Sequence, residues 1–326
     1  MKRYLKHPID YQIQINLVRD FRYFLSNQLL QYGVKVPPDD SKVILKFFEL
    51  QRRVIAKRPR KVLISKDFSY PPEIAARVMK LIRKIESGES LLPHLSRKFL
   101  DPNFHDALLN DWGIHHLHLG TEIDNDGFVN RNRSDFINDY LLFLRITDKH
   151  AYLIKIGKHG EWANKTLFEI LHKYWPDSIS QYRIVDGLSI IGNEPTEKER
   201  MKLRKSGAIT LTSVNDKAVY YPVGGGYATS QNSLEAVRQS HYYSNMLTYA
   251  EINIKSNISH IYISLKRLYS KVDKSLNFQL FIFGSKFYVW ETNSNIFICL
   301  TRNRAWRIPL SSNGSSTVDF LRLELE

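Results

Sequence analysis

The sequence is poor in cysteine, since Cys299 is the single cysteine among 326 residues. One thiol cannot form an internal disulfide, which excludes the class of small secreted domains that disulfides hold together. The sequence also lacks any apolar run near the roughly 20 residues that a helix needs to span a bilayer. Its first residues are basic but no apolar segment follows them, so no secretory signal peptide is expected. We therefore expect a cytoplasmic protein that does not enter a membrane.

Acidic residues are scarce relative to basic ones. The chain has 33 Asp and Glu against 47 Lys and Arg, which gives a formal net charge of +14. The first hundred residues hold 21 basic side chains against 9 acidic ones, whereas residues 101–150 hold 4 against 9. Basic side chains neutralise phosphates and release counterions, so RNA or another nucleic acid is the expected partner.

The densest basic run lies at residues 52–61. Such a run either binds a nucleic-acid backbone or forms the solvated face of a helix, and composition leaves both interpretations open. On the first interpretation, the candidate nucleic-acid-binding residues are Arg52, Arg53, Lys57, Arg58, Arg60 and Lys61.

Hydrophobic periodicity and turn residues predict an α+β fold in three consecutive regions. These are a basic helical region at 1–92, a histidine-bearing α+β domain at 93–190, and a C-terminal α+β domain with an antiparallel meander at 191–326. The patterns predict helices at 9–33, 42–56, 71–88, 95–112, 162–174, 196–205 and 233–246. They predict strands at 114–119, 139–147, 151–156, 208–212, 218–223, 278–283, 287–291, 296–300 and 306–310.

Three histidines lie in one short apolar segment, residues 112–120. Side chains alternate along a strand, so His116 and His118 share one face while His115 points to the other. Imidazole is the side chain that titrates near neutral pH, and two of them on one face indicate acid/base chemistry or metal binding.

The two following strands extend this face. If the three strands pair, one sheet surface gathers potential acids, bases and phosphate-binding cations without a carboxylate, which favours phosphate chemistry over a glycosidase-like carboxylate pair. The candidate catalytic residues are His116, His118, His159, Arg145 and Lys155.

Two alternatives remain open for the histidines. A His-x-His pair on a strand offers two nitrogens to a divalent transition metal, and His116, His118 and His159 together would make a metal site for a nuclease or hydrolase. The other alternative is a non-enzymatic nucleic-acid-binding module in which the histidines are structural.

Gly224-Gly225-Gly226 follows a predicted strand. Backbone amides in such a triplet can approach a phosphate, but the Lys-Ser/Thr pair of a phosphate-binding loop is missing. The triplet is therefore interpreted as a turn.

The central region resembles a known family. A short helix is followed by a histidine-rich strand at 112–120, by an apolar hairpin at 139–147 and 152–159, and by Gly-x-His at the end of that hairpin. In these features, residues 95–176 resemble the RelE and ParE-like toxin ribonucleases, which belong to the wider barnase and EndoU-like ribonuclease fold.

The resemblance implies an endoribonuclease of toxin or phage-defence type that works without a metal or other cofactor. It implies that His116 or His118 is the general base, that His159 is the acid, and that an antitoxin or inhibitor protein is a further partner. The family usually has an Arg just after the final His, whereas Gly160 follows His159 here. This departure leaves stabilisation of the phosphate to Arg145, Lys155 or Lys158.

Overall fold

The computed structural model describes residues 11–131, 136–184, 194–215, 218–268, 272–284 and 286–299. The chain divides into two compact units. The terminal unit comprises residues 1–30, 36–44 and 240–326, and the histidine unit comprises residues 31–35 and 45–239. Helices and mixed sheets occur together, which confirms the α+β class.

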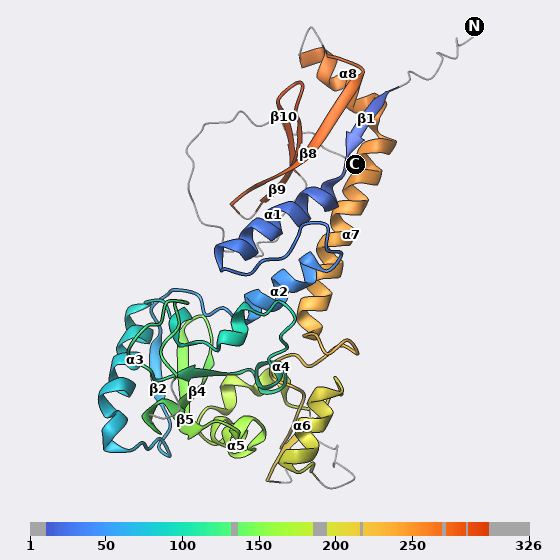
Figure 1. Ribbon diagram of the computed structural model, residues 1–326. Helices are drawn as coiled ribbons and strands as arrows, with labels where there is room; N and C mark the ends of the chain where they lie inside the picture. Colours follow the sequence, from blue (N-terminus) through green and yellow to red (C-terminus); the bar gives the residue numbers. More distant parts are fainter. Residues whose placement is uncertain are drawn as a thin grey trace, which may run out of the picture. The chain divides into compact units, whose positions relative to one another are not determined.

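Figure 1 shows the elements in chain order. The α-helices are α1 (Leu17–Gln31), α2 (Val43–Arg53), α3 (Ala75–Ser87), α4 (Ala107–Trp112), α5 (Thr166–Tyr174), α6 (Glu197–Lys205), α7 (Leu234–Ser256) and α8 (Ile258–Leu268). The strands are β1 (Gln12–Ile15), β2 (Lys61–Ile64), β3 (Ile114–His118), β4 (Tyr140–Ile146), β5 (His150–Lys158), β6 (Thr212–Val214), β7 (Ala218–Tyr220), β8 (Ser275–Phe283), β9 (Lys286–Glu291) and β10 (Ile296–Cys299). Two short 3-10 turns, η3 (Arg97–Leu100) and η5 (Glu161–Ala163), also concern the site. Among the described helices, none combines the length and hydropathy that crossing a bilayer requires.

The histidine unit is built on a four-stranded sheet in the order β2-β5-β4-β3. Strand β4 runs antiparallel to both β3 and β5, while β2 pairs in parallel with β5. The register places His116 opposite Phe143, and Phe143 opposite Lys155. The three central strands therefore lie within a few residues of the predicted ones, and β3 forms one edge of the sheet.

The main core of the histidine unit lies between this sheet and α5. Ile114, Leu141 and Phe143 share a sheet face with His116 and pack with Leu167 and Phe168 of α5. Apolar residues at α-helical spacing give α5 this buried side, which removes both surfaces from water. The same packing fixes the sheet that carries the histidines.

Helix α4 leads directly into β3. Asp106 caps the helix N-terminus, its carboxylate accepting a hydrogen bond from the Leu109 amide. Gly113 ends the helix with φ of 65°, a left-handed conformation that glycine adopts without strain. The turn at Gly113 therefore starts β3 one residue later, at Ile114.

The glycine triplet packs against the last turn of α4. The amides of Gly224 and Gly226 donate to the carbonyls of Asp111 and Asn110, each at 2.9 Å. A Cβ on Gly224 would lie 1.9 Å from the Leu109 carbonyl oxygen, so only glycine fits there. The glycine triplet therefore lies close to the backbone of α4, and it acts as a packing contact within the chain.

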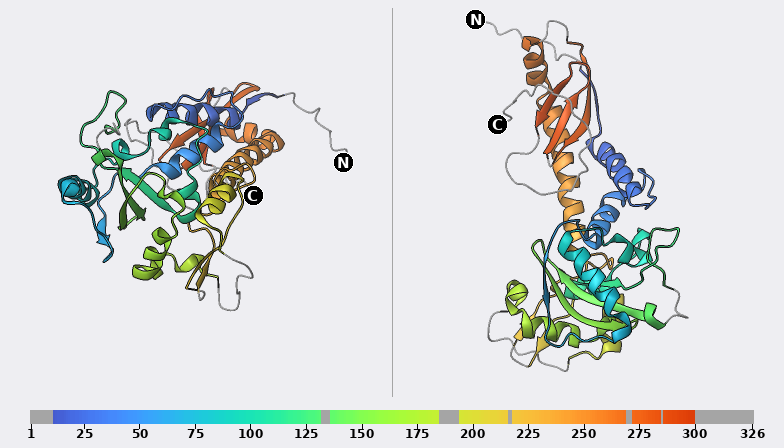
Figure 2. Two further views of the ribbon diagram at one scale, coloured as in Figure 1. Left: turned by 60° about the horizontal axis from the view of Figure 1, so that its bottom comes forward. Right: turned by 90° about the vertical axis from the view of Figure 1, so that its left-hand side faces the viewer.

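The terminal unit joins residues that are far apart in the sequence. Its sheet has the order β1-β8-β9-β10, with β1 parallel to β8. Figure 2 gives two further views of these elements. Phe287 packs on Phe21 of α1 and Tyr243 of α7, with ring centroids 5.6 and 5.4 Å apart. The carboxylate of Glu251 accepts the Leu17 amide at 2.6 Å, which ties α7 to the start of α1.

Several sequence predictions differ from this structure. Residues 12–15 form β1 and not the start of a helix, because Gln-Ile-Gln-Ile alternates with the period of a strand and β8 supplies a partner. Residues 61–64 add β2 to the central sheet, so region 1–92 is not a separate helical domain. Of the predicted helix at 95–112, only η3 and α4 form. The predicted strand at 306–310 lies outside the described residues.

Candidate functional site

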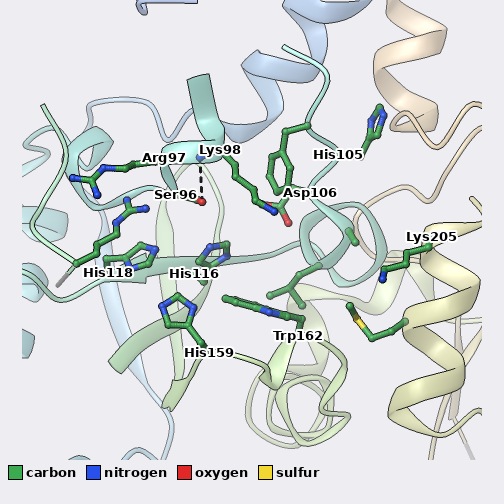
Figure 3. A pocket seen from close by; sticks show the side chains of 15 residues that line it. Ser96, Arg97, Lys98, His105, Asp106, His116, His118, His159, Trp162 and Lys205 are labelled. Carbon is green, nitrogen blue, oxygen red and sulfur yellow. Dashed lines mark hydrogen bonds between the residues drawn. The ribbon is translucent and has the colours of Figure 1, made fainter. Parts of the chain in front are cut away.

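His116, His118 and His159 line one pocket of the histidine unit, with a volume of about 630 Å³. The pocket lies between β3, the end of β5, η3, η5, the start of α4 and the second half of α6 (Figure 3). Its other lining residues are Ser96, Arg97, Lys98, Phe104, His105, Asp106, Ala107, Leu108, Arg131, Trp162, Met201 and Lys205.

The three imidazoles contact one another and one indole. The ring centroids of His116 and His118 lie 5.9 Å apart, and those of His118 and His159 lie 5.4 Å apart. Trp162 lies 4.6 Å from His116 and 5.7 Å from His159. Strand alternation places the first two histidines on one face, and the turn after β5 brings the third beside them.

The turn that carries His159 is fixed by Glu161. Its carboxylate accepts the Lys158 amide and the Lys155 ammonium, each at 2.7 Å. It also fills the space beside Gly157, where a Cβ would lie 2.7 Å from the carboxylate. Gly160 has φ of 102°, which lets the chain reverse into η5. Lys155, a predicted catalytic residue, is therefore paired at this turn and does not line the pocket.

A buried cluster of ion pairs binds the backbone of Trp162. Arg204 of α6 donates to the Trp162 carbonyl and pairs with Asp111 at 2.9 Å. Arg200 pairs with the same carboxylate at 3.3 Å, and both guanidinium groups lie over the ring of Trp112. Because these side chains are almost fully buried, they fix α6, and with it Met201 and Lys205, against the pocket.

The histidines of β3 are held in the neutral form. Burial, together with Arg131 and neighbouring histidines, lowers the pKa of His118 to about 2. Burial lowers the pKa of His116 as well, and that of His115 on the opposite face to about 4. The Nδ1 atoms of His116 and His118 are buried and meet no hydrogen-bond partner among the described residues. At neutral pH these rings are therefore available as proton acceptors.

The cations of the pocket come from connecting segments. Arg131 donates to the Leu95 carbonyl, and burial lowers its pKa to about 10, so it remains charged at neutral pH. The Lys98 ammonium lies 5.3 Å from the centre of the Phe104 ring. Arg97, in contrast, pairs with Asp124 and Asp126, which satisfy most of its charge.

Arg145 lies away from the pocket, contrary to the role predicted for it. It shares a sheet face with His116, but its guanidinium is buried beside Gly113 and donates to the Ser178 carbonyl at 3.4 Å. It is 8% exposed. The alternation along β4 correctly predicts the sheet face on which Arg145 lies. Along the strand, however, Arg145 stands opposite Ile114, which belongs to the hydrophobic core. Arg145 and Lys155 are thus replaced as candidate phosphate ligands by Arg131 and Lys98.

The basic run at 52–61 is not a continuous exposed surface. Arg53 and Arg60 are 5% and 6% exposed, and both donate to backbone carbonyls of neighbouring segments. Arg52 donates to the Gly224 carbonyl at 2.5 Å. Guanidinium groups with several donors suit this crosslinking of loops, so these three arginines have structural partners.

The remaining members of the run lie nearer the surface. Arg58 pairs with Asp148 at 2.8 Å, while Lys57 and Lys61 are exposed. Two lysines and a paired arginine are therefore what this run offers to a nucleic acid.

No group of three or more His, Cys, Asp or Glu side chains within the described ranges is arranged to hold a metal ion. The alternative metal site at His116, His118 and His159 thus gains no support from the geometry.

Sequence reasoning missed the other twelve lining residues of the pocket, including Lys98, Asp106, Arg131, Trp162 and Lys205. Trp162 stands three residues after His159 and could have been found from that spacing. Lys98, Asp106, Arg131 and Lys205 come from segments without a motif, and only tertiary structure brings them to the histidines.

Comparison with protein-family models, with curated proteins and with solved structures finds no match for this chain, so the resemblance to toxin ribonucleases remains a prediction.

Proposed function

We propose that the protein is a ribonuclease of toxin or phage-defence type that cleaves RNA by metal-independent histidine acid/base catalysis. The observation that supports this most is that the imidazoles of His116, His118 and His159 line one pocket together with Arg131 and Lys98. Acid, base and charge stabilisation are the three requirements of RNA cleavage through the ribose 2′-hydroxyl. The toxin or defence setting and the cytoplasmic location rest on the resemblance and composition alone.

The proposed reaction needs one base and one acid. His116 removes the proton of the 2′-hydroxyl, and the 2′-oxygen forms a bond to phosphorus. His159 gives a proton to the 5′-oxygen as the bond between that oxygen and phosphorus breaks. The products are a 2′,3′-cyclic phosphate and a free 5′-hydroxyl. Arg131 and Lys98 stabilise the negative charge on the phosphate oxygens.

His118 has a different part in this scheme. A pKa of about 2 means that it binds no proton at neutral pH, so it cannot act as the acid and is a weak base. Its ring contacts the rings of both His116 and His159. We assign it to orienting the phosphate as a neutral hydrogen-bonding group, and we assign the base to His116, whose pKa burial also lowers.

The test is cleavage of labelled single-stranded RNA, with and without EDTA, by the wild type and by His116→Ala, His118→Ala and His159→Ala. Removing a general acid or base should slow cleavage roughly 10²–10⁴-fold. The matched control is His241→Ala, because His241 is an exposed histidine of the terminal unit and should leave the rate unchanged.

The outcomes separate the candidate functions. Cleavage that survives EDTA, leaves cyclic phosphate ends and is blocked by a 2′-deoxy sugar at the scissile position supports the proposal. Loss of cleavage only with EDTA favours the metal-dependent alternative. RNA binding without cleavage under either condition favours the non-enzymatic module and contradicts the proposal.

A further inference from the structure

The pocket has two chemically different ends. Figure 3 shows Arg97 and His118 toward one end, His105 and Lys205 toward the other, and His116 between them. The segment before α4, together with α4, η5 and α6, supplies the apolar lining. These residues are Phe104, Ala107, Leu108, Trp162 and Met201. The chemistry proposed above uses the imidazoles and cations but leaves this apolar part without a role.

We propose that the apolar end is a subsite for one unpaired nucleobase that carries an exocyclic amino group, with Asp106 as its hydrogen-bond acceptor. The inference rests on the proposed ribonuclease function and specifies the substrate of that site.

The lining of this end suits a base. A nucleobase has two apolar faces and a polar edge, and sites for such ligands have mostly apolar walls with a few placed polar groups. Here the walls include apolar side chains, and the polar groups are His105, Asp106 and Lys205. A base inside a duplex has its polar edge paired and its faces stacked, so only an unpaired base can enter.

Asp106 supplies the selectivity. Its Oδ1 accepts the Leu109 amide at 3.0 Å, and Oδ2 has no hydrogen bond to the described residues. An ionised carboxylate only accepts hydrogen bonds, so it favours an edge with an amino group. Adenine, cytosine and guanine carry such a group, whereas uracil places two carbonyl oxygens around its single N–H. The Lys205 ammonium can donate to a ring nitrogen or carbonyl on the same base.

The first experiment measures binding of short homopolymers of adenosine, cytidine or uridine, all with 2′-O-methyl sugars that prevent cleavage, by fluorescence anisotropy. The wild type should bind the adenosine and cytidine polymers roughly tenfold more tightly than the uridine polymer, since uracil lacks the amino group from which the Asp106 carboxylate would accept a hydrogen bond.

Asp106→Asn is the informative variant. Asparagine caps a helix as well as aspartate does, so α4 should be retained. Its amide can donate to uracil, so the preference over the uridine polymer should fall toward one. The matched control is Asp177→Asn, which removes an exposed carboxylate outside the pocket and should leave the preference unchanged.

A second variant tests the place of the subsite. Ala107→Met extends a side chain from α4 into the apolar end and should weaken binding of all three polymers. Ala76→Met makes the same change on an exposed position of α3 and should have no effect.

Three results would overturn the subsite: equal binding of the three polymers by the wild type, an unchanged preference in Asp106→Asn, or no binding of any polymer. The results that would overturn the subsite differ from the results that would contradict the proposed ribonuclease function. RNA cleavage without base preference removes the subsite alone, whereas selective binding without cleavage in the first assay removes the ribonuclease and retains the subsite.

Discussion

At the scale of single residues, the most unusual side chains are the neutral buried histidines. His94, His115 and His118 are 7%, 9% and 2% exposed, and burial lowers the pKa of each well below 6.5. The Nδ1 of His94 lies 2.8 Å from the His118 carbonyl oxygen, so this ring also supports β3. Burial thus has two effects: it keeps these rings neutral at pH 7, and it makes the fold sensitive to acid.

We predict that stability falls steeply as the pH drops below about 6.5. The folded-state pKa values are about 4 for His94 and His115 and about 2 for His118, so the unfolded chain binds more protons below pH 6.5. Each histidine then contributes a slope of up to about 1.4 kcal/mol per pH unit, and stability rises with pH in this window. Denaturant unfolding at a series of pH values measures the slope.

His115→Leu provides the internal check. It removes one of the three groups and should make the slope shallower by about one proton. His260→Ala removes an exposed histidine and should not alter it. A slope that is the same in His115→Leu and in the wild type would contradict the assignment.

At the scale of elements, the pocket depends on a helix that is held by buried charge. Thr196 and Glu199 form a capping box at the start of α6, as the sequence predicts. Asp111 then binds Arg200 and Arg204 from the end of α4. Because α4 also leads into β3, this one carboxylate links the elements that supply the imidazoles to those that supply Trp162 and Met201.

We predict that Asp111→Asn destabilises the histidine unit by about 3–5 kcal/mol, because it leaves the buried guanidinium of Arg204 without its carboxylate partner and Arg200 with Glu194 alone. Asp148→Asn breaks the pair with Arg58, in which Asp148 is largely exposed, and should cost less than about 1 kcal/mol. Thermal unfolding of the two variants beside the wild type measures the difference. Equal losses of stability in the two variants would show that the buried cluster around Asp111 stabilises the protein no more than an exposed ion pair does.

The elements with strong local signals could be predicted from the sequence. The alternation of β3 placed His116 and His118 on one face, and Asp148-Lys149 placed the hairpin of β4 and β5. β1 and β2 were missed, because each is short and pairs with a strand far along the chain. The pocket cations were missed for the same reason, since no local pattern marks Lys98 or Arg131.

At the scale of the whole molecule, the chain forms two units that interrupt each other in sequence. The expected division into consecutive regions at 1–92, 93–190 and 191–326 differs from this arrangement. Composition cannot reveal it, because β1 pairs with β8 across more than half of the chain. The boundary between the units falls within α7, which has the longest run of residues among the described helices.

We predict that Phe287→Ala unfolds the terminal unit selectively. The ring packs on Phe21 and Tyr243, and truncating such a buried phenylalanine costs about 3–5 kcal/mol. Amide hydrogen exchange should therefore accelerate in β8 and β9, while the amides of β4 and β5 keep their protection. Equal acceleration in both sheets would show that the two units unfold as one.

The pocket residues come from two kinds of segment, which differ in how readily they change during evolution. His116, His118 and His159 belong to or directly follow paired strands, whereas Lys98, Asp106 and Arg131 lie in the segments that connect strands and α-helices, Lys98 within the short turn η3. Connections accept substitution and changes in length more readily than paired strands do. Under the proposed function, descendants of this chain can therefore exchange one RNA target for another by altering connections, while the groups that transfer protons are inherited unchanged.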